Sequence, residues 1–488
     1  MPEFVFLWTD IFIFCLLAGV LLYAVKAARS ASLRAAWATV GRRPSAMCAA
    51  MMLGVFVLLG VLDSVHYRPL LAPAGSAPAV YSPVLRSALD DLLSLTQMGR
   101  SEATYSAPLA IRQFTKETQF INGAAVRDYP RLKHAGTYLK QDSDHRADVL
   151  RRAIAGAAAG LAAGAAMAAL MVLACVRREG SWRSAWQRWR RGETDIPWRA
   201  MWVMFCVLAV LAGVAVSLSL DYHVLGTDRT GNDVLRQGLK GLRTALVIGT
   251  LTTLAMLPPA LIFGISAGYF RGWIDDAIQY LYTTLTSIPG VLLIAACVLM
   301  MQVYIDSNPN LFPTVAARAD LRLFLLCLIL GLTGWAGLCR LLRAETLKLR
   351  ELEYVQAARA FGLGSWRIML RHILPNVMHI ILITMVLEFS GLVLYEAVLS
   401  YLGIGVDPTT PSFGTMIDAA RLEMSRDPMI WWNLLTAFVF LLALVLSANI
   451  LADAVQDAFD PRVRRFRARR PGRRAAGSMP QAPREDGV

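Results

Sequence analysis

Residues 430–452 read IWWNLLTAFVFLLALVLSANILA and contain no charged side chain. A helix that crosses the hydrocarbon core of a bilayer needs roughly 20 mainly apolar residues, because its backbone amides find hydrogen-bond partners only within the helix. Eight further stretches meet this criterion, at residues 4–25, 46–62, 152–175, 200–220, 242–268, 286–305, 321–342 and 377–400. The sequence therefore predicts an all-α polytopic bundle of about nine membrane spans.

The composition of the whole chain agrees with a membrane protein. Of the 488 residues, 56% are hydrophobic and only 17% are charged, against roughly 25% charged residues in soluble domains. The formal net charge of +14 comes from basic clusters between apolar stretches, which is typical of cytoplasmic loops and not of a nucleic-acid-binding face. We expect contact with membrane lipid and none with nucleic acid.

Charge in the connecting loops predicts how the chain crosses the membrane. Residues 26–45, 177–199 and the tail 461–488 are rich in arginine, whereas 306–320 and 401–429 mix acidic residues with few bases. Because basic loops tend to stay in the cytoplasm, the first three segments are predicted to be cytoplasmic. With nine spans the N-terminus then lies outside and the C-terminus inside, and the tail is expected to be disordered.

The polar segment 63–151 falls on the outer side in this topology. It contains tyrosines, prolines and charges of both signs, and it is too long for a simple turn. A small periplasmic subdomain and a partly disordered loop both fit it. In the span that follows, Gly156, Gly160 and Gly164 recur at every fourth residue, which favours close helix pairing. The alternative is that an alanine-rich helix has this spacing by chance.

The sequence contains no pattern of a catalytic or metal site. None of the seven cysteines forms a CxxC pair, and the six histidines are scattered without an HExxH motif. We infer neither disulfides nor a metal centre. The chain also lacks a GxxxxGK[ST] phosphate loop and has no Gly-Lys dipeptide. We therefore expect no enzyme activity, no cofactor and no ATP site in this chain.

The most informative segment is 344–375. Residues 345–361 have helical periodicity but carry too many charges to cross a membrane, so a cytoplasmic helix is predicted. Gln356-Ala357-Ala358-Arg359 lies near its end, Gly362 suits a helix terminator, and Ile373-Leu374-Pro375 opens the next span. The alternatives are a protruding knob of two short helices and an amphipathic connector on the membrane surface.

The run YVQAARAFGLGSWRIMLRHILPN, residues 354–376, resembles the EAA loop of ABC importer permeases. That family has Glu-Ala-Ala, three residues, Gly, ten residues and, in its peptide branch, Ile-Leu-Pro. Gln356 stands where the family usually has glutamate, so a salt link at this position is in doubt. HVLGTDRTGNDVLRQGLKGLRTALVIG (223–249), EAVLSYLGIGVDPTTPSFGTMIDAAR (396–421) and DAFDPRVR (457–464) resemble further segments of the peptide branch. The similarity covers about residues 220–467.

The resemblance implies the second permease of a dipeptide or oligopeptide importer in the bacterial inner membrane. Such a chain forms half of a translocation pathway with a homologous second permease. Two cytoplasmic ATPases, which bind ATP and Mg, would dock on the EAA loop, and a periplasmic peptide-binding protein would deliver the solute. The motif at the outer face would comprise Gly226, Thr227, Asp228, Gly231 and Asp233.

The N-terminal part departs from the usual six spans of the family. If residues 200–220 form the family's first helix, three extra spans precede it. If residues 46–62 form that helix, the first outer loop has gained a hairpin of two spans. We divide the chain into N-terminal spans (1–62), a periplasmic segment (63–151), additional or first core spans with a basic loop (152–220), a type I permease core (221–460) and a tail (461–488).

Two carboxylates are candidates for the translocation pathway. Glu388 and Glu396 lie in a predicted span, where an ionisable side chain is costly and usually faces protein or water. Contact with the ammonium group of a peptide is one hypothesis, and pairing with a neighbouring helix is the other. A secondary transporter that uses Glu388 as a proton carrier is the alternative function. A membrane enzyme built on Asp90, Asp91, His134 and His145 is a third hypothesis, without recognisable catalytic spacing.

Overall fold

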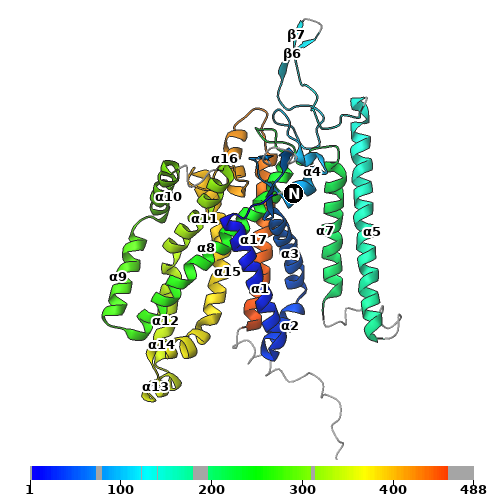
Figure 1. Ribbon diagram of the computed structural model, residues 1–488. Helices are drawn as coiled ribbons and strands as arrows, with labels where there is room; N and C mark the ends of the chain where they lie inside the picture. The colour runs from blue at the N-terminus through cyan, green and yellow to red at the C-terminus, as the bar shows by residue number, and fades with distance from the viewer. Residues whose placement is uncertain are drawn as a thin grey trace, which may run out of the picture.

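The computed structural model describes residues 3–72, 80–121, 124–139, 141–179, 196–308 and 314–459. In this part of the chain, nine helical segments are long and apolar enough to cross a membrane. They form an elongated bundle with few strands (Figure 1). The prediction of an all-α bundle with about nine spans is confirmed. The tail 461–488 and most of the basic loop 177–199 lie outside the described residues.

The membrane-spanning segments follow the predicted order. Four precede the family-like region: α1 (Trp8–Arg29), α3 (Pro44–Asp63), α5 (His145–Glu179) and α7 (Trp198–Ser219). The other five contain α8 (Val234–Phe270), α10 (Gly290–Ser307), α11 (Val315–Gly334) continuing into α12 (Ala336–Arg350), α14 (Ser365–Ile368) with the π-helical turn η4 (Met369–Ile373) continuing into α15 (Leu374–Tyr401), and α17 (Trp432–Phe459).

Short elements connect these spans. The helical ones are α2 (Ala31–Gly41), α4 (Ala88–Ser94), η1 (Gln97–Gly99), η2 (Asp142–Asp144), α9 (Trp273–Ser287), α13 (Glu353–Ala360) and α16 (Phe413–Glu423). The strands form three small antiparallel sheets: β1 (Glu3–Phe4), β2 (His66–Arg68) and β5 (Arg86–Ser87) in the order β1-β2-β5, β3 (Leu70–Ala72) with β4 (Val80–Tyr81), and β6 (Glu117–Ile121) with β7 (Ala124–Asp128).

The bundle has two distinct ends. The β6–β7 hairpin projects from one of them, here called the hairpin end, and α13 lies at the other, here called the α13 end (Figure 1). The N-terminus lies beside α4, toward the hairpin end (Figure 1). Loops that are predicted to lie outside, including the one that carries α16, therefore share an end of the molecule.

Helix α8 is the centre of the bundle. It packs against α3, α11, α12, α15 and α17, and its small residues allow close approach. A side chain at Gly268 would collide with Thr346 of α12. The helix begins at Val234, earlier than the predicted 242, because the Asp233 side chain accepts a hydrogen bond from the amide of Arg236 at 3.1 Å and caps the first turn.

Helices α5 and α7 form a close pair at the side of the bundle (Figure 1). A side chain at Gly156 would overlap the backbone of Gly213, and one at Gly160 would overlap the backbone of Ala209. The predicted helix pairing through these glycines is confirmed. The pair reaches the rest of the bundle through contacts of α7 with α3, whereas α3 itself packs on α8 and α17.

The described part of segment 63–151 lies on the hairpin end of the core. Its apolar residues Leu89, Leu93 and Met98 form one cluster with Leu235 of α8. The segment is thus folded against the bundle and shares its core. Of the two interpretations of this segment, the structure favours an ordered one for the residues described.

Candidate functional site

The segment predicted to be a knob consists of α13, a glycine turn and α14. The single helix predicted over 345–361 is divided between the end of α12 and α13 (Glu353–Ala360). Gly362 follows α13 as the predicted terminator, with a φ of +77° that glycine adopts without steric cost. The amide of Gly362 donates to the carbonyl of Arg359 at 3.0 Å, and the amide of Leu363 donates to that of Ala358 at 3.2 Å. The chain then turns into α14, and the π-helical turn η4 leads into α15 through Leu374 and Pro375.

One side of α13 attaches the knob to the bundle. Val355 and Ala358 are buried, and they share a core cluster with Ile368 and Ile373 and with residues of α8 and α12. Ala358 therefore faces the bundle. Ala357 and Arg359 are exposed. The periodicity of Val355 and Ala358 explains the difference, because residues three apart share one helix face.

Ion pairs and hydrogen bonds join the base of the knob to neighbouring helices. Arg350, at the end of α12, donates to the carbonyl of Tyr269 at 2.6 Å, and Arg271 pairs with Glu351 at 2.6 Å. About two turns earlier in α12, Arg343 binds Asp275 of α9 with two hydrogen bonds of 2.6 and 2.7 Å. These contacts connect the base of the knob to α8, α9 and α12.

The tip of the knob is apolar and exposed, a feature that sequence reasoning missed. Phe361 is 87% exposed and Trp366 is 62% exposed. Trp366 borders a groove together with Arg367, Arg371 and Pro375. The sequence does contain a signal for this surface. Phe361 is a large aromatic residue next to the terminating Gly362, and it lies outside the apolar face of α13 that Val355 and Ala358 form. Gln356 is also exposed, and its side-chain amide donates to the backbone carbonyl of Glu351 at 3.1 Å.

The predicted outer-face motif forms a turn beneath segment 100–136. Gly226 and Gly231 have positive φ angles, and their missing side chains leave room for the carbonyl groups of Ser106 and Glu102. The hydroxyl of Thr227 accepts from the Ser106 amide at 2.7 Å and donates to the Thr104 carbonyl at 2.8 Å.

Two aspartates complete this turn. Asp228 accepts from the amides of Thr230 and Asn232, both at 2.8 Å, and Asp233 caps α8. The motif therefore joins segment 100–136 to the start of α8.

A buried charge cluster underlies the same turn. The Nδ1 atom of His223 lies 2.8 Å from Asp233, and its Nε2 atom lies 3.6 Å from Glu102. Burial lowers the pKa of His223, but hydrogen bonding to Asp233 and the charge of Glu102 outweigh burial and raise the pKa to about 9. Burial raises the pKa of Glu102, but the nearby His223 ring and hydrogen bonds from the amides of Lys133 and His134 hold it at about 2.

The two candidate pathway carboxylates have different surroundings on α15. Glu396 is buried and accepts from the hydroxyls of Ser400 at 2.7 Å and Ser412 at 3.0 Å. Its carboxylate thus attaches α15 to the loop before α16, and its contact with a solute stays a prediction. Glu388 is partly exposed, and within the described residues its carboxylate makes no hydrogen bond or ion pair. Contact of Glu388 with a solute stays a prediction.

In the part of the chain that the structure describes, no group of three or more His, Cys, Asp or Glu side chains is placed to hold a metal ion. The geometry instead provides an exposed knob that is connected to the long core helices.

Comparison with known proteins is consistent with this geometry. Residues 260–465 match the family described as binding-protein-dependent transport system inner membrane component. The chain is 34% identical over 245 residues to the oligopeptide transport system permease protein OppC of Mycobacterium bovis, covering 50% of this chain and 78% of that protein.

Two further relatives cover similar shares. The dipeptide transport system permease protein DppC of Bacillus subtilis is 31% identical over 244 residues, covering 50% of this chain and 70% of the relative. The glutathione transport system permease protein GsiD of Pectobacterium atrosepticum is 30% identical over 298 residues, covering 55% and 92%. The resemblance that the sequence motifs indicated is thereby confirmed.

Proposed function

This chain belongs to the family of inner-membrane permease components of binding-protein-dependent transport systems, and from that premise we propose that it forms half of the pathway of an ATP-driven peptide importer. The peptide solute is proposed because the relatives are named as oligopeptide, dipeptide and glutathione permeases. The comparisons give no support to the alternative of an ion-gradient transporter.

The observation that carries this proposal is the knob of α13 and α14. Its buried side attaches it to α8 and α12, while the side chains of Phe361 and Trp366 are exposed. Exposed aromatic side chains in a small protruding surface are favourable anchors for a protein partner. We assign this surface to a cytoplasmic ATPase subunit.

The proposed assembly contains this chain, a homologous second permease, two ATPases and a periplasmic peptide-binding protein. ATP and Mg would be bound by the ATPases. The α13 end then faces the cytoplasm and the hairpin end faces the periplasm, so that the N-terminus lies outside and the tail inside. This orientation is supported by the arginine-rich loops predicted to be cytoplasmic.

The mechanism requires two arrangements of the permease pair with similar free energy. ATP binding draws the two ATPases together, and the knob passes this displacement to α8, α9 and α12 through the contacts at its base. The ATPases bias the equilibrium only as far as they bind one arrangement more tightly than the other. This chain contributes shape and rigid connections to the cycle.

The proposal is tested by purifying the tagged chain in mild detergent, identifying its partners and measuring ATP hydrolysis. We expect a second permease and two ATPases to accompany it. Phe361→Ala and Trp366→Ala should each lower peptide-stimulated hydrolysis about tenfold, since truncating a central anchor costs roughly 1–2 kcal/mol or more. Ala358 is unsuitable for this test because it is buried in the fold.

Trp273→Ala is the matched control, because this tryptophan is also exposed, at 78%, but lies outside the knob at the start of α9. It should leave hydrolysis unchanged. A chain that purifies alone, or hydrolysis that is unaffected by both knob substitutions, would contradict the proposed function.

A further inference from the structure

A buried arginine connects the N-terminal addition to the core. Arg243 lies in α8 near the hairpin end and is 7% exposed. Its guanidinium donates at 2.6 Å both to the Thr9 hydroxyl and to Asp10, and at 3.1 Å to the Ser64 hydroxyl. Thr9 and Asp10, in the first turn of α1, are completely buried. The beginning of α1 thus supplies a direct counter-charge for a core arginine.

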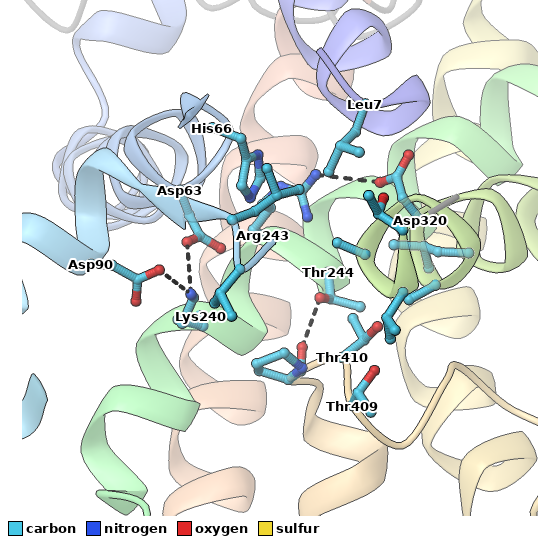
Figure 2. Close-up of a pocket in the computed structure, with 18 of the residues that line it drawn as sticks. Leu7, Asp63, His66, Asp90, Lys240, Arg243, Thr244, Asp320, Thr409 and Thr410 are labelled. Atoms are coloured by element: carbon cyan, nitrogen blue, oxygen red, sulfur yellow. Dashed lines mark hydrogen bonds and ion pairs between the residues drawn. The ribbon is translucent and has the colours of Figure 1, made fainter. Parts of the chain in front are cut away.

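Helix α11 contributes a second carboxylate to the same cluster. Asp320 lies 3.6 Å from Arg243 and accepts from the amide of Thr9 at 3.1 Å. Figure 2 shows Arg243 between groups that come from different elements, with Asp320 on one side and His66 on the other. His66, which follows α3, contacts Asp10 at 2.8 Å. We call these five residues, Thr9, Asp10, His66, Arg243 and Asp320, the Arg243 cluster.

Independent contacts hold α1 in place at this end. Strand β1 pairs with β2 through Glu3 and Arg68 and through Phe4 and Tyr67. The rings of Trp8 in α1 and Phe324 in α11 lie with their centroids 6.0 Å apart. Farther along α1, most side chains are exposed. The first turn is therefore the main point at which α1 is attached to α8 and α11.

The Arg243 cluster borders a cavity of about 510 Å³. Its other walls come from Lys240 with Asp63 and Asp90, and from residues Thr409 and Thr410 before α16 (Figure 2). The cavity separates the cluster from the loop that Glu396 attaches to α15. The loop is joined to α8 next to the cluster, where the Thr244 hydroxyl donates to the Pro411 carbonyl at 2.7 Å (Figure 2).

The cluster lies at the opposite end of α8 from the knob. Helix α8 runs from Val234 to Phe270 and packs along α11 and α12, which continue to Arg350 at the base of the knob. Close-packed helices pass a displacement along their length, and a connection at the far end keeps them together there. The Arg243 cluster is the buried polar connection at that far end.

On the basis of the proposed transport function, we propose that Arg243 is a positioning residue and that α1 is a working part of the permease. Through Thr9 and Asp10, α1 holds the outer ends of α8 and α11 together, so that the three segments move as one body when the knob is displaced. In this proposal, α1 takes part in the transport cycle directly.

The charges of the cluster predict the order in which substitutions of its carboxylates impair transport. Asp10→Asn leaves Arg243 with Asp320, which lies at the longer distance of 3.6 Å. Asp320→Asn leaves the closer pair of Arg243 and Asp10, at 2.6 Å. The double variant removes both carboxylates that pair with Arg243 and leaves the buried guanidinium with only the charge of Asp63, which forms no ion pair with it. This is the costliest state. We expect Asp320→Asn to be mild, Asp10→Asn to be severe, and the double variant to lose more than the two effects combined.

The experiment uses the complete transporter in proteoliposomes, with its binding protein and with di- and tri-alanine as probe peptides. Asp10→Asn should lower peptide uptake and peptide-stimulated hydrolysis about tenfold at an equal amount of assembled complex, with basal hydrolysis retained. Glu3→Gln is the matched control, since Glu3 is an exposed N-terminal acid with a distant 3.9 Å contact to Arg68. It should transport like the wild type.

A cross-link separates positioning from a loss of folding. Trp8→Cys and Phe324→Cys, joined by a short bifunctional maleimide, should restore uptake to Asp10→Asn, because the cross-link replaces the connection of α1 to α11. Wild-type uptake by Asp10→Asn, or no rescue by the cross-link in an assembled complex, overturns the positioning role. If the wild-type transporter itself shows no peptide-stimulated hydrolysis, the proposed function fails as well.

Discussion

At the scale of single residues, His223 makes the hairpin end sensitive to pH. Its pKa is raised to about 9, against an ordinary value of 6.5, and this difference corresponds to about 3 kcal/mol of stabilisation. The stabilisation is fully present below pH 6.5 and is lost as the pH rises through 9. Glu102, with its pKa lowered from 4.5 to about 2, contributes stability above pH 4.5 that is lost as the pH falls toward 2.

We therefore expect segment 100–136 to be held most firmly between about pH 4.5 and 6.5. The amides of Lys133 and His134, which donate to Glu102 at 2.9 and 2.8 Å, report on this directly. Their hydrogen-exchange protection factors, corrected for intrinsic rates, should fall between pH 6.5 and 9. His223→Gln should abolish that decrease, and a pH-independent protection factor in the wild type would contradict the assignment.

The sequence predicted the terminating Gly362, and the family resemblance implied the outer-face motif, but neither indicated the partners of the buried charges. Gly362, Asp233 and the turn at Gly231 follow from local backbone requirements, which depend on a few neighbouring residues. Glu102 and His223, or Asp10 and Arg243, are far apart in the sequence, and only the fold brings them together. Such pairs have no local signature, so a single sequence cannot reveal them.

At the scale of elements, the close approach of α5 and α7 depends on glycine. A side chain at Gly160 would meet the carbonyl of Ala209 and the backbone of Val210 at 2.5–2.6 Å, well inside contact distance. We expect Gly160→Leu to separate the two helices and to cost at least about 1–3 kcal/mol, as overpacking usually does.

Loss of this contact should appear as a lower melting temperature of the purified chain. A spin-label or cross-linking pair between α5 and α7 should report a larger separation in the same sample. Gly19→Leu is the control, because a side chain at Gly19 of α1 meets nothing within 4 Å. A Gly160→Leu variant with wild-type stability and spacing would show that the pairing does not depend on this glycine.

The helices that could be predicted from the sequence are those that are defined by a long stretch of apolar residues. All nine spans were found in order, since the bilayer requirement acts on each one separately. Helices α9 and α16 were missed because each is short and carries charges, so that its sequence resembles a loop. Their helical form comes from packing and caps, as when Ser412 accepts from the Thr415 amide at 3.0 Å to start α16.

At the scale of the whole molecule, packing separates the two accounts of the N-terminal addition. Helix α3 packs directly on α8 and α17, whereas α5 contacts mainly α7, and α7 contacts α3. The arrangement favours α3 as the counterpart of the family's first helix and α5–α7 as a hairpin inserted into the outer loop. Helix α1 is then a further addition, attached to the core by the Arg243 cluster.

This account predicts that the α5–α7 hairpin can be removed while α1 cannot. The outer ends of the hairpin lie close together, since Asp148 contacts Tyr222 at 3.0 Å and Arg152 contacts Asp221 at 2.5 Å. Replacing residues 146–218 by a short Gly-Ser linker deletes two spans and preserves the orientation of all others. Insertions whose ends are adjacent are commonly removable without loss of the host fold.

We expect the shortened transporter to assemble and to retain peptide-stimulated hydrolysis within about threefold, because the contacts between knob, α8 and α11 are untouched. Deletion of residues 1–42 removes Asp10 and leaves Asp320 as the ion-pair partner of Arg243. The deletion should therefore lose uptake like Asp10→Asn. The comparison is made in proteoliposomes at matched amounts of complex. A helix of the shared core is required for coupling in every member of the family. If the hairpin deletion abolishes coupling and the N-terminal deletion does not, then α7 is the family's first helix and α1 is dispensable.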